Sequence, residues 1–181
     1  MGLNMLLTIF AFILFGSLLI SDDSLMSKNI ELEAQNEVAL EAFGQIQSLI
    51  DEAKSKAFDE NTTPSEVSSV SGMSTTLGTD NLGENISLPD TLASSKFASV
   101  SHFDDVDDYN GYVRLIRRTS RDGDTIRVSV AYTSVTNPDT TGFTGKSYCK
   151  KMTVTLTSPF FQKPTPSSPL PSYSMTYIFT Y

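Results

Sequence analysis

The sequence predicts an α+β protein in which a long N-terminal α-helix packs on a four-stranded antiparallel β-sheet head. Residues 1–58 have the apolar spacing of one continuous helix, and residues 112–181 contain four short segments in which apolar and polar side chains alternate. A Ser/Thr-rich loop region, residues 59–111, joins the two. A single sheet needs a cover for its apolar face, and the helix is the expected cover.

The first twenty residues, "MGLNMLLTIFAFILFGSLLI", contain no charged side chain. As a helix, the apolar stretch from Leu3 to Ile20 would be about 27 Å long, which is close to the thickness of the bilayer hydrocarbon. A secretory signal peptide has a basic segment before its apolar run and a small-residue cleavage site after it. The sequence has neither, so we predict a transmembrane helix that is not removed by cleavage after its apolar run.

An amphipathic helix is predicted to continue the membrane segment from Ser24 to Phe58. This stretch has no proline and a single glycine, and its apolar residues recur at spacings of three, four and seven. Together the two segments would form a helix of roughly 55 residues, about 80 Å long. A helix of this kind usually packs on a partner surface, and the alternative is a free-standing coiled coil or stalk.

The loop region 59–111 is rich in Ser, Thr, Gly and Asn and shows no sustained period. We expect it to follow the surface, with its scattered apolar side chains packed on the helix or sheet. Asn61 and Asn85 begin sequences of the N-glycosylation type, although an unmodified loop is the leading interpretation. The apolar side chains expected to pack inwards are Val67, Val70, Met73, Leu77, Leu82, Ile86, Leu88 and Leu92.

Four strands are predicted after Gly111, in "YVRLIRR", "TIRVSVAYT", "KKMTVTLTS" and "SMTYIFTY". The Asp122-Gly123 pair between the first two is a strong hairpin signal. Turn-forming residues and prolines separate the later strands, so an antiparallel meander is expected.

Charge and cysteine content exclude several classes of function. The net charge is -8 and the pI is about 4.5, which disfavours binding to nucleic acid. The basic residues from Arg114 to Arg127 alternate with apolar ones, as on the solvent face of a strand. Cys149 is the only cysteine, so an intrachain disulfide is impossible.

The segment "FDDVDDYNGY" is the strongest candidate for a site in the head. Its acidic and amide oxygens suit calcium, but their spacing fits the helix-loop-helix calcium pattern poorly. No nucleophile or cation lies near them in sequence, and His102 is the only histidine, so we expect no enzyme activity. The leading interpretation is a solvated acidic turn in which Asp side chains accept backbone hydrogen bonds and Asn110-Gly111 forms the bend, with calcium binding as the alternative. The calcium candidates are Asp104, Asp105, Asp107, Asp108 and Asn110.

This layout resembles the type IV pilin and pseudopilin superfamily. In local sequence, the segments "FDDVDDYNGY" and "KKMTVTLTSP" are most similar to pilins of the mannose-sensitive haemagglutinin type. The resemblance implies a structural subunit that sits in the inner membrane and is then assembled by a pilus or type II secretion-like machine into a helical, extracellular homo-oligomeric filament. It implies no cofactor beyond a calcium ion in some pseudopilin heads.

Two features depart from the family. Its mature chains carry a glutamate at the fifth position where this sequence has Met5, and its basic leader is absent here, so we expect the sequence to begin at the mature residue. A minor pseudopilin and a monomeric membrane-anchored binding domain, with a contact patch near Phe160, Phe161 and Tyr173, are the alternatives. The residues expected to carry assembly are Leu3, Asn4, Met5, Leu6, Leu7, Phe10, Phe12 and Phe15.

Overall fold

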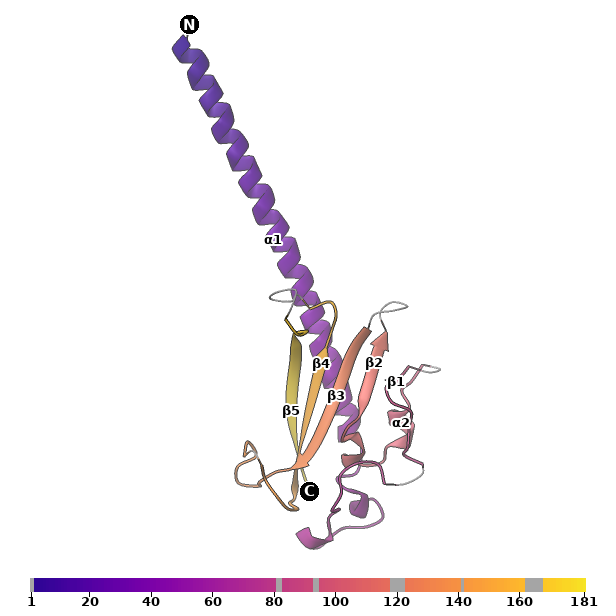
Figure 1. The fold of residues 1–181 in the computed structure, drawn as a ribbon. Coiled ribbons are helices and arrows are strands. Elements are labelled where there is room, and N and C mark those ends of the chain that lie inside the picture. Colours follow the sequence, from indigo (N-terminus) through magenta and orange to yellow (C-terminus); the bar gives the residue numbers. More distant parts are fainter. Residues whose placement is uncertain (1, 81–82, 93–94, 118–122, 141, 162–167) are drawn as a thin grey trace. The chain divides into compact units, whose positions relative to one another are not determined.

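The structure is a computed structural model that describes residues 2–80, 83–92, 95–117, 123–140, 142–161 and 168–181, with the side chains of 22–24 excepted (Figure 1). The chain divides into two compact units, residues 1–40 and 41–181. The described residues of the first unit, 2–40, all belong to helix α1. The second contains the end of that helix, the loop region and the sheet.

Helix α1 runs from Gly2 to Lys54 and has 53 residues. It contains no proline, and Lys54 in its last turn interacts favourably with the carbonyl end of the helix. The long N-terminal helix is therefore confirmed, although it ends before the predicted Phe58. An 18-residue window of α1 reaches a mean hydropathy of 2.4, so the helix is long and apolar enough to cross a membrane.

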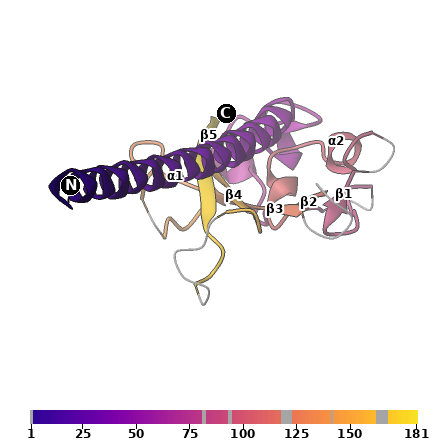
Figure 2. The same cartoon turned by 90° about the horizontal axis from the view of Figure 1, so that it is seen from above.

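The sheet has five strands in the order β1-β2-β3-β4-β5, not the predicted four (Figure 2). β2 (Val113–Arg117), β3 (Gly123–Tyr132), β4 (Cys149–Thr157) and β5 (Ser172–Thr180) are antiparallel neighbours, as expected. β1 (Asp90–Thr91) lies parallel to β2, so the sheet is mixed. The prediction of a purely antiparallel sheet is wrong because a two-residue strand inside a Ser/Thr-rich loop leaves no alternating pattern in the sequence.

The predicted hairpin joins β2 to β3, with Arg117 opposite Gly123. Asp122 lies outside the described residues. Gly123 is needed for space: a Cβ atom there would lie 2.4 Å from the carbonyl oxygen of Ile116. The positive φ angle expected of a turn glycine is found at Gly111 instead, where φ is 82° and the chain bends into β2.

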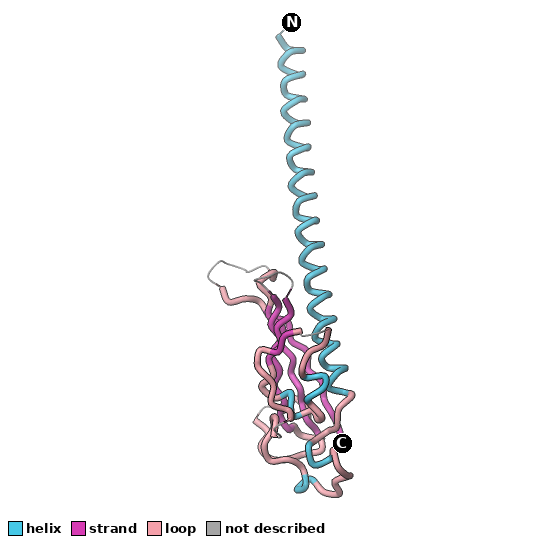
Figure 3. The backbone as a smooth tube through the Cα atoms, turned by 90° about the vertical axis from the view of Figure 1, so that its right-hand side faces the viewer, coloured by secondary structure: helices cyan, strands magenta, loops and turns pink. Residues whose placement is uncertain are grey.

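The core of the second unit lies between the last turns of α1 and one face of the sheet (Figure 3). On the helix side, Ala42, Ile46, Leu49 and Ala53 are fully buried, at the spacing that places them on one face. Alternate residues of the two central strands, β3 and β4, supply the other side. These residues are Ile126, Val128, Val130, Met152, Val154 and Leu156.

The loop region contains short helical turns at η1 (Glu60–Thr62), η2 (Val70–Gly72), α2 (Ser99–His102) and η3 (Asp107–Tyr109). Of its apolar side chains, Met73 is buried as expected, whereas Leu88 and Leu92 are exposed, and the expectation for these two is wrong. Leu82 lies outside the described residues. Hydrogen bonds to buried carboxylates also hold parts of this loop, including those from Ser74 to Asp59 and from Ser99 to Asp90.

Candidate functional site

The apolar surface of residues 3–20 is the first candidate site. All eight residues expected to carry assembly lie on it and are exposed, with exposed fractions of 77% for Leu3 and Phe12 and 60% for Phe10. The hydroxyl of Thr8 donates to backbone carbonyls of its own helix, as does that of Ser17. Because these hydroxyls are already hydrogen-bonded, an apolar environment around this segment leaves them satisfied.

The acidic segment 104–108 folds into a turn held by its own side chains. Asp105 accepts hydrogen bonds from the backbone N–H groups of Asp107 and Asp108, at 2.8 and 3.1 Å. Asp108 accepts from the N–H groups of Asp104 and Asp105. These are the bonds expected of a turn. The expected exposure to solvent is wrong for Asp105, Asp107 and Asp108, all of which are buried.

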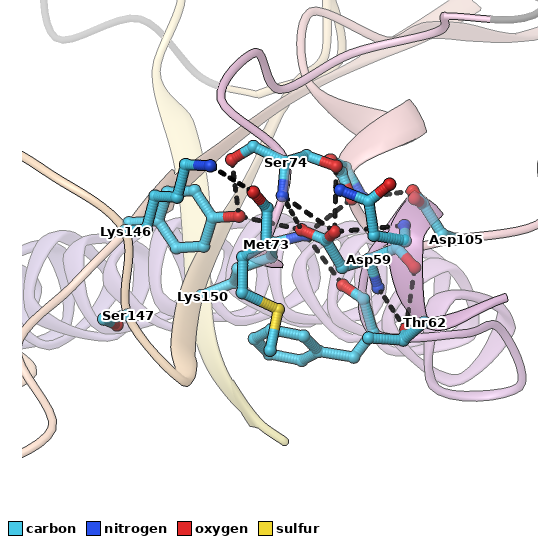
Figure 4. Close-up of polar contacts among 12 residues, drawn as sticks. Asp59, Thr62, Met73, Ser74, Asp105, Lys146, Ser147 and Lys150 are labelled. Atoms are coloured by element: carbon cyan, nitrogen blue, oxygen red, sulfur yellow. Dashed lines mark hydrogen bonds and ion pairs between the residues drawn. The ribbon is translucent and has the colours of Figure 1, made fainter. Parts of the chain in front are cut away.

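Burial of this turn depends on Lys150, whose side chain is fully buried in β4 (Figure 4). Its ammonium group donates to Asp107 Oδ1 at 2.6 Å, to Asp59 Oδ2 at 2.8 Å and to the carbonyl of Phe58 at 2.8 Å. It also lies 5.3 Å from the centre of the Tyr132 ring. A buried ammonium is costly unless it is paired, and here all three of its hydrogens have acceptors.

Lys150, Asp107 and Asp59, with Tyr132 and Ser74, form one largely buried polar cluster, which we call the Lys150 cluster. Asp59 follows the end of α1. It accepts hydrogen bonds from the N–H and hydroxyl of Ser74 and from the hydroxyl of Tyr132, as Figure 4 shows around Asp59 and Ser74. Burial alone would raise the pKa of Asp59, but the hydrogen bonds from Lys150 and Tyr132 hold it below the usual range. Asp59 is therefore ionised and fixed in place.

A second buried cluster surrounds Arg114 in β2. Its Nη2 donates to Glu52 Oε2 at 2.6 Å and to Ser99 Oγ at 2.9 Å. Tyr109 donates to the other oxygen of Glu52, and Tyr112 donates to Asp90. Arg114 was expected on the solvent face of a strand, and this is wrong, because it lies on the face of β2 that carries the buried Tyr112 of the preceding turn.

A third group consists of Glu60, Glu84 and Asp104, whose carboxylate oxygens lie within 4.8 Å of one another. Burial, together with the charges of Glu60 and Glu84, raises the pKa of Asp104. Nearby, burial and the same two glutamates raise the pKa of Asp80 to about 6. Such mutual repulsion is what a cation would relieve, although calcium prefers six to eight oxygen ligands and this group supplies three side chains.

The five predicted calcium ligands are not gathered into one group among the described residues. Asp104 joins the third group, whereas Asp105 and Asp108 bind backbone N–H groups and Asp107 pairs with Lys150. The side chain of Asn110 donates to the carbonyl of Leu77 and accepts from the N–H of Val130. Calcium binding stays the untested alternative to an acidic turn, and the carboxylates most suitable for it are those of the third group.

The predicted contact patch near the C-terminal strand is only partly exposed. Phe160 is exposed, but Phe161 is buried and packs edge-on against Tyr173 with ring centres 4.8 Å apart. Tyr173 also contacts Phe43 of α1, at 5.1 Å. Two of these three rings therefore contribute to packing of the head.

Sequence reasoning missed the charged residues of the buried clusters, although a signal for Lys150 was available. Met152, Val154 and Leu156 share one face of β4, and counting back by two places Lys150 on that same face. A charged residue in an apolar register requires a buried partner of opposite charge. No comparable signal marks Asp59 or Glu52, which are far from their partners in sequence.

The fold and these clusters define an α+β head with buried ion pairs, on a chain whose N-terminal helix exposes a continuous apolar surface. Comparison of the chain with family models, with curated proteins and with solved structures gives no match.

Proposed function

We propose that this protein is a structural subunit of a type IV pilus-like filament that polymerises through its N-terminal helix. The observation that supports the proposal best is the exposed, uncharged surface of residues 3–20. An apolar surface of this extent stays in lipid or is covered by other protein. Helices of identical subunits provide such a cover, because each supplies the same apolar side chains.

The composition of the head agrees with a structural role. Two of its basic side chains, those of Lys150 and Arg114, form buried ion pairs with carboxylates inside the chain. In the proposed cycle the subunit rests in the inner membrane, and a pilus or secretion assembly machine moves it into the filament, with the head outwards. Among the alternatives are a minor pseudopilin and a monomeric membrane-anchored binding domain.

Assembly is tested by expressing the chain in its native cells, shearing the cell surface and imaging the sheared fraction for filaments that contain it. Phe10→Asp places an unpaired charge in the proposed helical core and is expected to abolish filaments, whereas the matched Phe10→Leu is expected to preserve them. Membrane fractions of both variants show whether each chain still inserts. Filaments of normal abundance from an inserted Phe10→Asp chain would disprove polymerisation through this helix.

If the wild-type chain stays in the membrane fraction and gives no filaments, the proposal fails and a membrane-anchored head is the better interpretation. If each filament contains only a few copies of the chain, the minor pseudopilin is the correct interpretation. Immunogold labelling distinguishes these two results from labelling along the whole filament, which is the result expected of the main subunit.

A further inference from the structure

The Lys150 cluster places one amine against two carboxyl groups in an enclosed part of the head. Nζ of Lys150 lies 2.6 Å from Oδ1 of Asp107 and 2.8 Å from Oδ2 of Asp59, and its side chain has no exposed surface. The rings of Phe58 and Tyr132 flank the ammonium group at 4.8 and 5.3 Å. No substrate reaches this amine from solvent, so any reaction it undergoes involves the chain itself.

The two carboxyl groups have different environments. Asp59 is held by Ser74 and Tyr132 as well as by Lys150, and these donors keep it ionised and fixed. Asp107 shares a side-chain hydrogen bond with Asp105. Burial and the neighbouring Asp107 raise the pKa of Asp105 to about 9, so Asp105 carries a proton at neutral pH. An acidic proton therefore lies beside the Asp107 carboxyl group.

We propose that Lys150 and Asp107 form an intramolecular isopeptide bond, an amide between Nζ and Cγ, with Asp105 transferring protons and Asp59 positioning the amine. The reactants are adjacent, pre-oriented by several hydrogen bonds and shielded from water. Holding reacting groups in this way supplies a large part of the barrier reduction in intramolecular reactions.

The reaction balances without another reagent. The ammonium group first passes one proton to the Asp107 carboxylate along their hydrogen bond, which leaves a neutral amine and a neutral acid. The Nζ lone pair attacks Cγ, and Asp105 gives its proton to the departing hydroxyl, so that the Cγ–O bond breaks and water leaves. Asp105 then recovers a proton from the nitrogen. The net change is ammonium plus carboxylate to amide plus one water.

The product suits a buried position better than the reactants do. An ion pair in a protein interior retains a large desolvation cost, whereas an amide is neutral. The bond would tie η3 to β4 and close the chain between residues 107 and 150. A covalent link of this kind limits the unfolded chain in the way a disulfide does, and Cys149 alone cannot form an intrachain disulfide.

Intact-mass spectrometry of the purified full-length chain tests the proposal. The wild-type mass is expected to be lower than the sequence mass by one water, and peptide mapping is expected to find Lys150 joined to Asp107. Lys146→Met is the matched control, because Lys146 is also a hydrogen-bonded lysine but contacts backbone carbonyls of Ser71 and Met73 rather than a carboxylate. This variant is expected to lose one water like the wild type.

The isosteric Asp105→Asn keeps the size of the side chain but lacks the acidic proton, and Lys150→Met lacks the amine. Both are expected to have their full sequence mass. Circular dichroism of Asp105→Asn shows whether the head still folds. A folded wild-type chain with its full sequence mass would overturn the proposal, as would a water loss that maps to Asp59 or elsewhere. A water loss in Asp105→Asn equal to that of the wild type would overturn the role of Asp105.

Discussion

Nη2 of Arg114 lies 2.6 Å from Oε2 of Glu52, and this ion pair joins strand β2 to the end of helix α1. The other oxygen of Glu52 accepts from Ser99 at 2.7 Å and from Tyr109 at 2.9 Å. Four segments of the head therefore meet at one carboxylate. The pair is largely shielded, with 4% of the Arg114 side chain and 13% of the Glu52 side chain exposed. Removal of one partner leaves a charge that water reaches poorly.

Arg114→Met is expected to lower the free energy of unfolding by about 3–5 kcal/mol, because it leaves Glu52 as an uncompensated buried charge. Urea unfolding of the detergent-solubilised chain, followed by near-UV circular dichroism, measures this loss. Asp51→Asn is the control: it breaks the exposed pair between Asp51 and Lys54, and its effect should be far smaller. Equal effects of the two variants would show that the Arg114–Glu52 pair contributes no more than a surface contact.

The pH dependence of stability follows from the buried aspartates. Burial raises the pKa of Asp105 to about 9 and that of Asp108 to about 7, from an ordinary value of 3.8. Between pH 3.8 and its raised pKa, each of these carboxyl groups holds a proton in the folded chain but not in the unfolded chain. The free energy of unfolding therefore falls as the pH rises through this range. Asp59, with its lowered pKa, has the opposite effect, and its contribution is lost only below about pH 4.

We therefore expect the unfolding free energy to fall between about pH 4 and pH 9, by about 1.4 kcal/mol per unit for each carboxyl that stays protonated on folding. Asp105→Asn should reduce this slope most at pH 7–9, where Asp108 no longer contributes. The slope is the readout, since the absolute stability also changes when a buried group is replaced. A slope that is unchanged in Asp105→Asn would mean that Asp105 is ionised in the folded head.

The sequence predicted the parts of the fold that depend on local patterns. The helix and the four long strands follow from apolar periods of 3.6 and 2, which repeat over enough residues to be recognised. β1 could not be predicted, because two residues have no period. The same holds for the pairing of Lys150 with Asp59 and Asp107, which depends on contacts between residues 91 and 43 positions apart.

Burial of the acidic turn was mispredicted for a related physical reason. An acidic run is normally solvated, and a burial expectation for Asp107 needs a cation that the local sequence does not contain. That cation is Lys150, which lies on the apolar face of a strand that the sequence predicts correctly. For Arg114, the alternation of basic and apolar residues from Arg114 to Arg127 suggested a solvent face, and the structure exposes Arg117 and Arg127 but not Arg114. Alternate residues of a strand lie on opposite faces, and this alternation, rather than the charge of a residue, decides which residues are buried.

The tight approach at Gly123 gives a steric prediction. Gly123→Ala would bring Cβ against the backbone carbonyl of Ile116, and we expect a loss of about 1–3 kcal/mol because the backbone must shift. Gly44→Ala is the matched change in α1, where nothing lies within 4 Å of the new Cβ; it should stabilise by about 0.5–1 kcal/mol. Thermal unfolding of both variants measures the difference. Similar shifts for the two would contradict the steric explanation.

The sign of the effect of Asp104→Asn distinguishes an acidic cluster from a calcium site. At neutral pH without calcium, Asp104 is repelled by Glu60 and Glu84, which together with burial raise its pKa. Its neutral amide analogue should therefore stabilise the head slightly, while the backbone hydrogen bond from Asp104 to Asp108 remains.

Because Asp105 and Asp107 are engaged elsewhere, we expect wild-type thermal midpoints in calcium and in chelator to be nearly equal. A cation that binds the folded state alone must raise the midpoint. A large calcium-dependent rise in the wild type that Asp104→Asn removes would show that the three carboxylates bind calcium, whereas a higher midpoint for Asp104→Asn in both solutions would show that their repulsion is simply tolerated.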